Sequence, residues 1–127
     1  MLTLPASVRL FVATEAVDMR KGIDGLKLLA SNVVREDPLS GHIFVFANRR
    51  GNVMKALWWD RTGFVVLMKR LERGTFRLPR VEPPERRAEI DAGELHLLLE
   101  GFDRARAKPG KRWYRSPHKS LAERNSS

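Results

Sequence analysis

Four short apolar runs close together in the middle of the sequence constrain its fold more than any other feature. Residues 42–47, 53–59 and 64–71 are separated by short segments containing Asn, Asp and Gly, and residues 75–78 follow a turn at 72–74. Loops this short join antiparallel strands, because a parallel pair needs a crossover of about a dozen residues or more. The spacing therefore predicts an antiparallel four-stranded meander.

Two further segments precede this meander. Residues 8–13 form a short apolar run with β-branched and aromatic side chains, which predicts a strand. Between residues 23 and 34, apolar side chains recur at helical spacing, which predicts an amphipathic helix capped by Asp18 or Asp24. The unbroken apolar run at 42–47 is typical of a strand covered on both faces.

The segments after the meander differ sharply in character. Residues 80–90 combine two prolines with alternating charges, which predicts a linker. A second helix is predicted over 91–102, because Asp91 and Glu94 have the spacing of a capping box and Gly101 is a suitable stop. Residues 103–127 offer little to bury and are predicted to form a flexible basic tail.

These patterns predict one α+β domain over residues 1–102. Its elements are an N-terminal strand, a helix, the antiparallel four-stranded meander and a second helix. Both helices are expected to pack on one face of the sheet, because an isolated meander cannot bury its own apolar runs. The basic tail, 103–127, lies outside this domain.

Charge is the main clue to function. The chain has 24 Lys and Arg against 15 Asp and Glu, for a net charge of +9. Residues 1–79 carry net +6, residues 80–102 carry net −3, and residues 103–127 carry net +6. A basic chain favours a polyanionic partner, most often nucleic acid. The alternative is a solvated basic surface without a specific partner.

Much of the charge in the meander is predicted to gather at one end of the sheet. Alternate turns of an antiparallel meander lie at the same end, so the loops after 42–47 and 64–71 should be neighbours. Their arginines offer the bidentate geometry that phosphate accepts. The predicted DNA-contacting residues are Arg49, Arg50, Lys55, Lys69, Arg70 and Arg73, extended by Arg20 and Lys21 at the start of the first helix.

A second kind of surface is suggested by the adjacent tryptophans. On a strand, Trp58 and Trp59 point to opposite sides of the sheet. One of them would fill the core beneath a helix, and the other is a candidate platform for protein contact or base stacking. Burial of both in the core is the simpler alternative.

Several classes of chemistry are disfavoured by what the sequence lacks. With no cysteine it can form neither a disulfide nor a thiolate site, a composition that fits the reducing cytoplasm. Neither a secretory signal nor a membrane-spanning run is visible, so a cytoplasmic protein is expected. The acids of the body do not converge, so neither a catalytic centre, a metal site nor a cofactor is predicted. These acids are Asp18, Asp24, Asp37, Asp60 and Glu72.

Several motifs resemble one family closely. The chain is similar to the small accessory proteins of the insertion-sequence sixty-six family of bacterial transposable elements, encoded by the second open reading frame. The resemblance runs from about Leu4 to Phe102. Its motifs are Asp18-Met19-Arg20-Lys21-Gly22 with Asp24-Gly25-Leu26, the run from Asp37-Pro38 to Phe46, Lys55-Ala56-Leu57-Trp58-Trp59-Asp60 with Gly63, and Lys69-Arg70-Leu71-Glu72-Arg73-Gly74-Thr75-Phe76.

This resemblance implies a bacterial protein that assists transposition while a separate, larger transposase carries the catalytic acids. Two main hypotheses for its role stay open: a DNA-binding accessory factor, and an assembly module that binds the larger transposase through an exposed tryptophan and the 91–102 helix. A small nuclease is the least favoured third alternative. One departure from the family pattern is Asn52, where the family usually has an acid. This substitution makes the predicted basic surface more positive.

Overall fold

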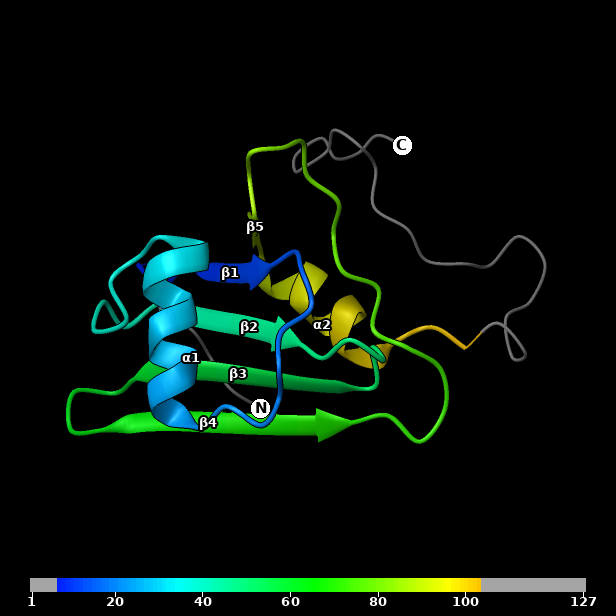
Figure 1. Cartoon of the computed structure of the whole chain (residues 1–127), viewed down its shortest axis with the longest axis horizontal. Coiled ribbons are helices and arrows are strands. Elements are labelled where there is room, and N and C mark those ends of the chain that lie inside the picture. Colours follow the sequence, from blue (N-terminus) through cyan, green and yellow to red (C-terminus); the bar gives the residue numbers. More distant parts are fainter. Residues whose placement is uncertain (1–6, 104–127) are drawn as a thin grey trace.

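The computed structural model describes residues 7–103 and shows an α+β fold built on one five-stranded mixed sheet (Figure 1). The strand order is β4-β3-β2-β1-β5. The strands are β1 (Leu10–Ala13), β2 (Ile43–Ala47), β3 (Val53–Trp59), β4 (Phe64–Arg70) and β5 (Arg87–Ile90). The helices are α1 (Ile23–Leu29), which continues into a π-helical turn (Ala30–Val34), and α2 (Ala92–Glu100).

The first three strands of the predicted meander are confirmed, but its fourth is wrong. β2, β3 and β4 pair antiparallel in sequence order. Residues 75–78 form no strand and make a single bridge, between Thr75 and Phe102. At Gly74 the backbone turns with φ +79°, and a side chain there would collide with the backbone of Phe102. This segment therefore crosses the end of the sheet and does not extend it.

The predicted linker at 80–90 contains a strand. β5 pairs antiparallel with β1, with Leu10 opposite Ile90 and Ala13 opposite Arg87. β1 in turn pairs parallel with β2, so the sheet is mixed. The two prolines and the alternating charges of this segment are not typical of a strand. The four residues of β5 form one because they pair with β1, and such pairing outweighs the intrinsic strand propensity of the residues.

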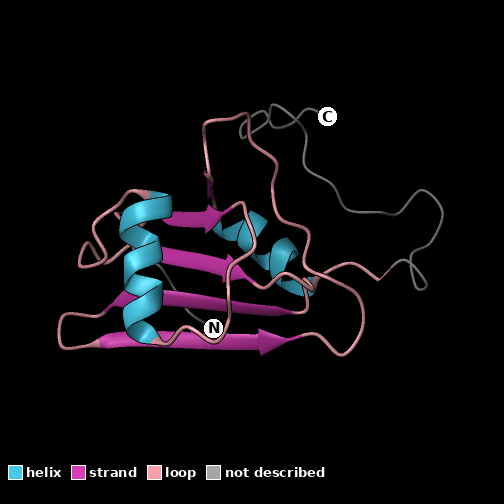
Figure 2. Cartoon of the chain, in the orientation of Figure 1, coloured by secondary structure: helices cyan, strands magenta, loops and turns pink. Residues whose placement is uncertain are grey.

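The two helices lie on opposite faces of the sheet (Figures 1 and 2), which corrects the prediction that both cover one face. On one face α1 buries Leu26 against Phe11, Phe44 and Leu57. On the other face α2 buries Leu98 in a separate core cluster. β2 is buried along its whole length because each face is covered, as its apolar run predicted.

The ends of the helices follow partly from the sequence. α2 has the predicted capping box, since the Asp91 side chain accepts from the Glu94 amide at 2.7 Å and the Glu94 side chain accepts from the Asp91 amide. It ends at Gly101, as predicted. The first residue before α1 is Gly22, which supplies no side-chain cap, so neither Asp18 nor Asp24 has the predicted role. Neither helix in the described part of the chain is long and apolar enough to cross a membrane.

Candidate nucleic-acid interface

The loop between β2 and β3 is shaped by one asparagine. The Asn48 side-chain oxygen accepts hydrogen bonds from the amides of Asn52 and Val53, each at 3.0 Å, and its Nδ2 donates to Asn52 Oδ1 at 2.8 Å. Gly51 completes the turn with φ +77°. These bonds fix the loop tightly, and Arg49 and Arg50 at its tip are exposed.

The loop after β4 packs directly against this loop, as the meander geometry predicted. The Leu71 amide donates to the Asn52 carbonyl at 2.8 Å, and the Phe76 amide donates to the Gly51 carbonyl at 2.7 Å. Arg73 lies in this second loop and is also exposed. The two loops are therefore hydrogen-bonded neighbours, and each of them carries exposed arginine.

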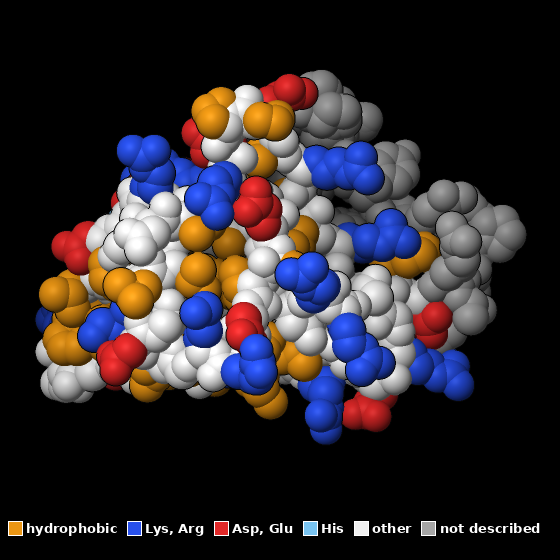
Figure 3. Space-filling model, in the orientation of Figure 1, with side chains coloured by type: hydrophobic (Ala, Val, Ile, Leu, Met, Phe, Trp, Pro, Cys, Tyr) orange, Lys and Arg blue, Asp and Glu red, His pale blue; other side chains and the backbone are white. Residues whose placement is uncertain are grey.

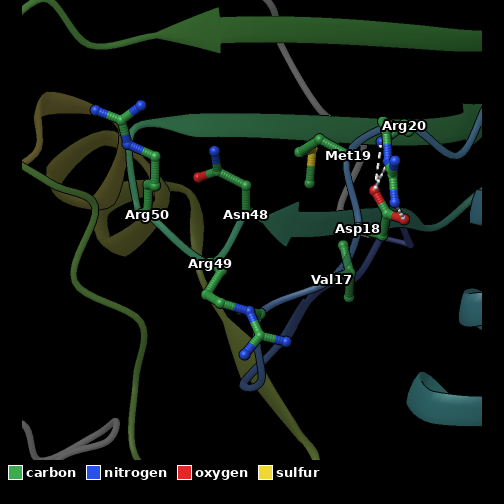
Figure 4. A pocket seen from close by; sticks show the side chains of 8 residues that line it. Val17, Asp18, Met19, Arg20, Asn48, Arg49 and Arg50 are labelled. Atoms are coloured by element: carbon green, nitrogen blue, oxygen red, sulfur yellow. Dashed lines mark hydrogen bonds and ion pairs between the residues drawn. The ribbon is translucent and has the colours of Figure 1, made fainter.

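A third segment joins them on the side of α1. The Val17 amide donates to the Ala47 carbonyl at 2.9 Å, which brings residues 16–20 beside the β2–β3 loop. Between the two lies an open hollow of about 410 Å³ (Figure 4). The side chains of Arg49 and Arg50 diverge from the loop at its edge (Figure 4). The hollow gives this end of the sheet a concave surface.

Five of the eight predicted DNA-contacting residues are exposed, and their side chains make no hydrogen bond or ion pair with any described residue. Figure 3 shows Lys and Arg side chains spread over this face, with several of them on the right-hand side. We call these five residues the free basic set: Lys21, Arg49, Arg50, Arg70 and Arg73.

The other three predicted residues are engaged within the protein. Arg20 binds Asp18 through two nitrogens, at 3.1 and 3.0 Å. Lys55 Nζ donates to the Met19 carbonyl at 3.1 Å, and Lys69 Nζ donates to the Leu99 carbonyl at 2.6 Å. The Arg20 bonds are local to the 16–20 segment, whereas the two lysine bonds tie that segment and the end of α2 to the sheet.

Among the described acids near this end of the sheet, the Asp18 carboxylate has a strongly altered pKa. The side-chain hydrogen bond from Arg20, helped by the Arg20 amide, lowers the pKa of Asp18 from 3.8 to about 2. Asp18 therefore stays ionised and holds Arg20 beside it. Because the Arg20 side chain is bound to Asp18, Arg20 is not a member of the free basic set.

The predicted DNA-contacting residues do not include Arg77, an exposed cation at this end of the described chain. Arg77 is exposed, and its guanidinium lies 4.2 Å from the centre of the Phe102 ring. It directly follows Phe76, whose amide bonds to the β2–β3 loop. Arg77 was not predicted to contact DNA because residues 75–78 were predicted to form a strand, which would place Arg77 within the sheet and not at its end.

The two tryptophans do point to opposite faces, and both are half-buried. Trp58 packs against the core cluster on the side of α2, while Trp59 contacts Phe64 with ring centres 5.0 Å apart on the side of α1. Neither is a fully exposed platform, and neither is fully buried.

Asp60 and Glu72 lie at opposite ends of β4 and do not form a common site. Asp60 accepts from the Thr62 and Gly63 amides in the β3–β4 turn, and these bonds together with the Thr62 hydroxyl lower its pKa. Glu72 lies beyond the other end of β4. Within residues 7–103, no three His, Cys, Asp or Glu side chains are placed to hold a metal ion together.

Comparison with known sequences identifies the family. The family model described as IS66 Orf2 like protein matches residues 8–109. The chain belongs to this family. Two proteins of Sinorhizobium fredii are similar to it: y4hO is 38% identical over 103 residues (81% of this chain and 88% of the relative), and y4jC is 36% identical over 107 residues (83% and 90%). No solved structure matches.

Family membership confirms the resemblance found in the motifs. It identifies an accessory protein of an insertion sequence, encoded by its second open reading frame. The match extends a few residues into 103–127. The prediction of a flexible basic tail there lies outside the described residues, as does any structural account of that segment.

Proposed function

We propose that this protein is a non-catalytic accessory factor that assists transposition by binding DNA at the end of its sheet where β2 and β4 finish. The observation that carries the proposal is the free basic set on three adjoining segments. Within residues 7–103, none of the side chains of its members forms an ion pair with an acid. They extend from the loop at 48–52 to the loop at 71–74 and the segment before α1.

A phosphate group supplies the negative charge that could neutralise these five cations. Exposed like charges held near one another repel, at a cost of some tenths of a kcal/mol per pair. A DNA backbone relieves that repulsion, and the planar guanidinium groups can each donate two parallel hydrogen bonds to one phosphate. If all five members bind phosphates, the logarithm of the binding constant falls with the logarithm of salt with a slope of about −4.5.

Such contacts position DNA and do not read its sequence. In the described part of the chain both helices pack on the sheet through apolar side chains. Sequence preference, if measured, therefore comes from the shape of the DNA or from a partner protein. The proposed role is to hold DNA for the larger transposase of the element.

Fluorescence anisotropy with a labelled duplex of the element's terminal inverted repeat, compared with a scrambled duplex across a salt series, tests this role. The double variant Arg49→Gln/Arg73→Gln should bind on the order of 10²-fold more weakly in 0.1 M salt, with a slope smaller in magnitude by about 2. Unchanged affinity in this variant would reject the proposed surface.

A matched control removes the same charge elsewhere. Arg35 and Arg61 are exposed, and they lie before β2 and in the β3–β4 turn, at the opposite end of the strands. The double variant Arg35→Gln/Arg61→Gln has the same net charge as the test variant. It should retain the wild-type salt slope, because these positions lie away from the proposed DNA path.

A second candidate function is assembly with the larger transposase without DNA contact. The observation in its favour is apolar exposure on the side of α2, where Trp58 is half-buried and Leu97 is 39% exposed. A pull-down with purified transposase, before and after nuclease treatment, separates the two functions. A complex that survives the nuclease and is lost in Leu97→Lys would favour assembly.

A further inference from the structure

Within residues 7–103 the sheet has two edge strands, β4 and β5, and β4 is the longer. β4 lies at the end of the strand order and pairs only with β3 among the described residues. The Leu71 amide donates to Asn52 of the preceding loop, and the Gly63 carbonyl accepts from Asp60. Since backbone groups alternate in direction along a strand, odd-numbered residues bond to β3 and even-numbered residues face outward. Phe64, Val66, Met68 and Arg70 therefore present their amides and carbonyls to the open side.

Apolar side chains accompany this open backbone on both faces. Leu67 is 57% exposed and Met68 is 61% exposed, and as neighbours on a strand they point to opposite faces. Residues 64–68 contain no charge, while Lys69 is engaged with the Leu99 carbonyl. A long apolar edge with unpaired backbone groups is a template for another strand.

We propose that a second copy of this chain pairs antiparallel with β4, so that two sheets join edge to edge. Two copies that pair in this way are related by a two-fold axis perpendicular to the sheet. On such an axis one residue lies opposite its own copy, so the numbers of any two paired residues add up to an even value. With Val66 on the axis, Phe64 lies opposite Met68 and Val65 lies opposite Leu67. This register covers both exposed apolar side chains with apolar partners.

Charge at the ends of the strand favours the same occupant. In this register Arg70 lies opposite Thr62 of the second copy, two residues from Asp60 in the β3–β4 turn. Asp60 is exposed, and its lowered pKa keeps it ionised. The pairing brings the Arg70 guanidinium of one copy toward the Asp60 carboxylate of the other at each end of the interface, which leaves Lys21, Arg49, Arg50 and Arg73 of the free basic set for DNA. DNA does not suit the middle of β4, because residues 64–68 offer no cation.

This inference does not rest on the proposed DNA binding. The dimer nevertheless has a consequence for DNA binding, because the two-fold axis places the basic surfaces of the two copies at opposite ends of the joined sheet. A dimer could then hold two separate segments of DNA, whereas a monomer presents one basic end.

Light scattering after size exclusion, on full-length protein treated with nuclease, tests the pairing. Wild type should have twice the 14.6 kDa chain mass, and Met68→Lys should have the mass of one chain. Leu28→Lys is the matched control, because Leu28 is 63% exposed and lies on α1. It should stay dimeric. A monomeric wild type at high concentration, or a dimeric Met68→Lys variant, would overturn the proposal.

Engineered cysteines give a second measurement that does not depend on that variant folding. The chain has no cysteine of its own, so a single introduced thiol reports one position. On the axis, the Cα atoms of two Val66→Cys residues would lie about 5.5 Å apart, within disulfide range. Mild oxidation should cross-link Val66→Cys and leave Leu28→Cys largely monomeric. Cross-linking of Leu28→Cys alone would reject the β4 interface, and equal cross-linking of both would also reject it.

Discussion

Arginine serves opposite purposes in two regions of this molecule. Along β1 and β5 the arginines are paired: Arg9 binds Glu89 through two nitrogens, at 2.9 and 2.8 Å, and Arg87 binds Glu36 at 2.6 Å. At the end of the sheet where β2 and β4 finish, Arg49 and Arg73 are exposed and have no such partner among the described residues. The first region uses its arginines to join chain segments, and the second leaves them available to a ligand.

The difference shows that a count of basic residues does not locate an interface. The same side chain is structural where the fold supplies an acid at hydrogen-bond distance and is available where it does not. Even the predicted basic surface divides in this way, since Arg20 is held by Asp18 while Arg49 nearby is free. Each of the following predictions tests this division.

The largest stability effect is expected at Arg87. Its guanidinium donates to the Val34 carbonyl at 3.0 Å and to Glu36, and it covers the Phe11 ring at 4.8 Å. Arg87→Ala should lower the free energy of unfolding by about 2 kcal/mol, because Glu36 then loses its half-buried partner. Urea denaturation measures this change. Arg50→Ala, the exposed counterpart, should change it by less than about 0.5 kcal/mol; equal losses would remove the distinction between the regions.

Acid should weaken the paired arginines. Hydrogen bonds from Arg9 lower the pKa of Glu89 below 4.5, and Arg20 lowers that of Asp18 from 3.8 to about 2. Both folded-state values lie below the unfolded ones, so the stabilisation is present above the unfolded pKa and disappears as the pH falls through the folded pKa. The melting temperature should therefore fall from about pH 5 downward.

The double variant Asp18→Asn/Glu89→Gln isolates this contribution. It should melt lower than wild type at neutral pH but lose less of its melting temperature on acidification, because two of the depressed carboxylates are gone. Thermal melts followed by circular dichroism at a series of pH values give the slopes. Identical slopes in the two proteins would show that these pairs do not contribute to acid sensitivity.

The smallest predicted effect is a change of charge within the unpaired region. Asn52→Asp should keep the fold, because a carboxylate oxygen can still accept the bond that Asn48 Nδ2 donates. The added negative charge beside the free arginines should weaken DNA binding about two- to threefold. Anisotropy measures the change, and Asn32→Asp on the π-helical turn, which adds the same charge to an exposed position, should have little effect.

Much of the fold could be predicted because its signals are local. The β2–β4 hairpins are encoded by short turns, and the α2 cap by the spacing of Asp91 and Glu94. β5 was missed because four residues with alternating charge become a strand only when β1 lies beside them. The position of the helices on opposite faces was also missed, because the parallel pairing of β1 with β2 determines where α1 crosses the sheet.

The candidate site was likewise predicted only where its features depend on local sequence. The sequence predicted that the loops carrying Arg49 and Arg73 are neighbours, because meander geometry alone requires it. It did not predict that Lys55 and Lys69 are bound to carbonyls, because those of Met19 and Leu99 lie thirty or more positions away in the chain. Arg77 was missed because its neighbours depend on how residues 74–76 cross the end of the sheet.

The family, the buried central strand, the hairpin turns and the end of the sheet that carries the exposed cations could all be predicted from the residues alone. These follow from residue type and spacing within short windows. The pairing of the arginines, the open strand edge and the sheet faces covered by the helices are properties of the folded chain that the residues alone did not predict. Each of these depends on contacts between distant segments, and such contacts exist only once the register of every strand is set.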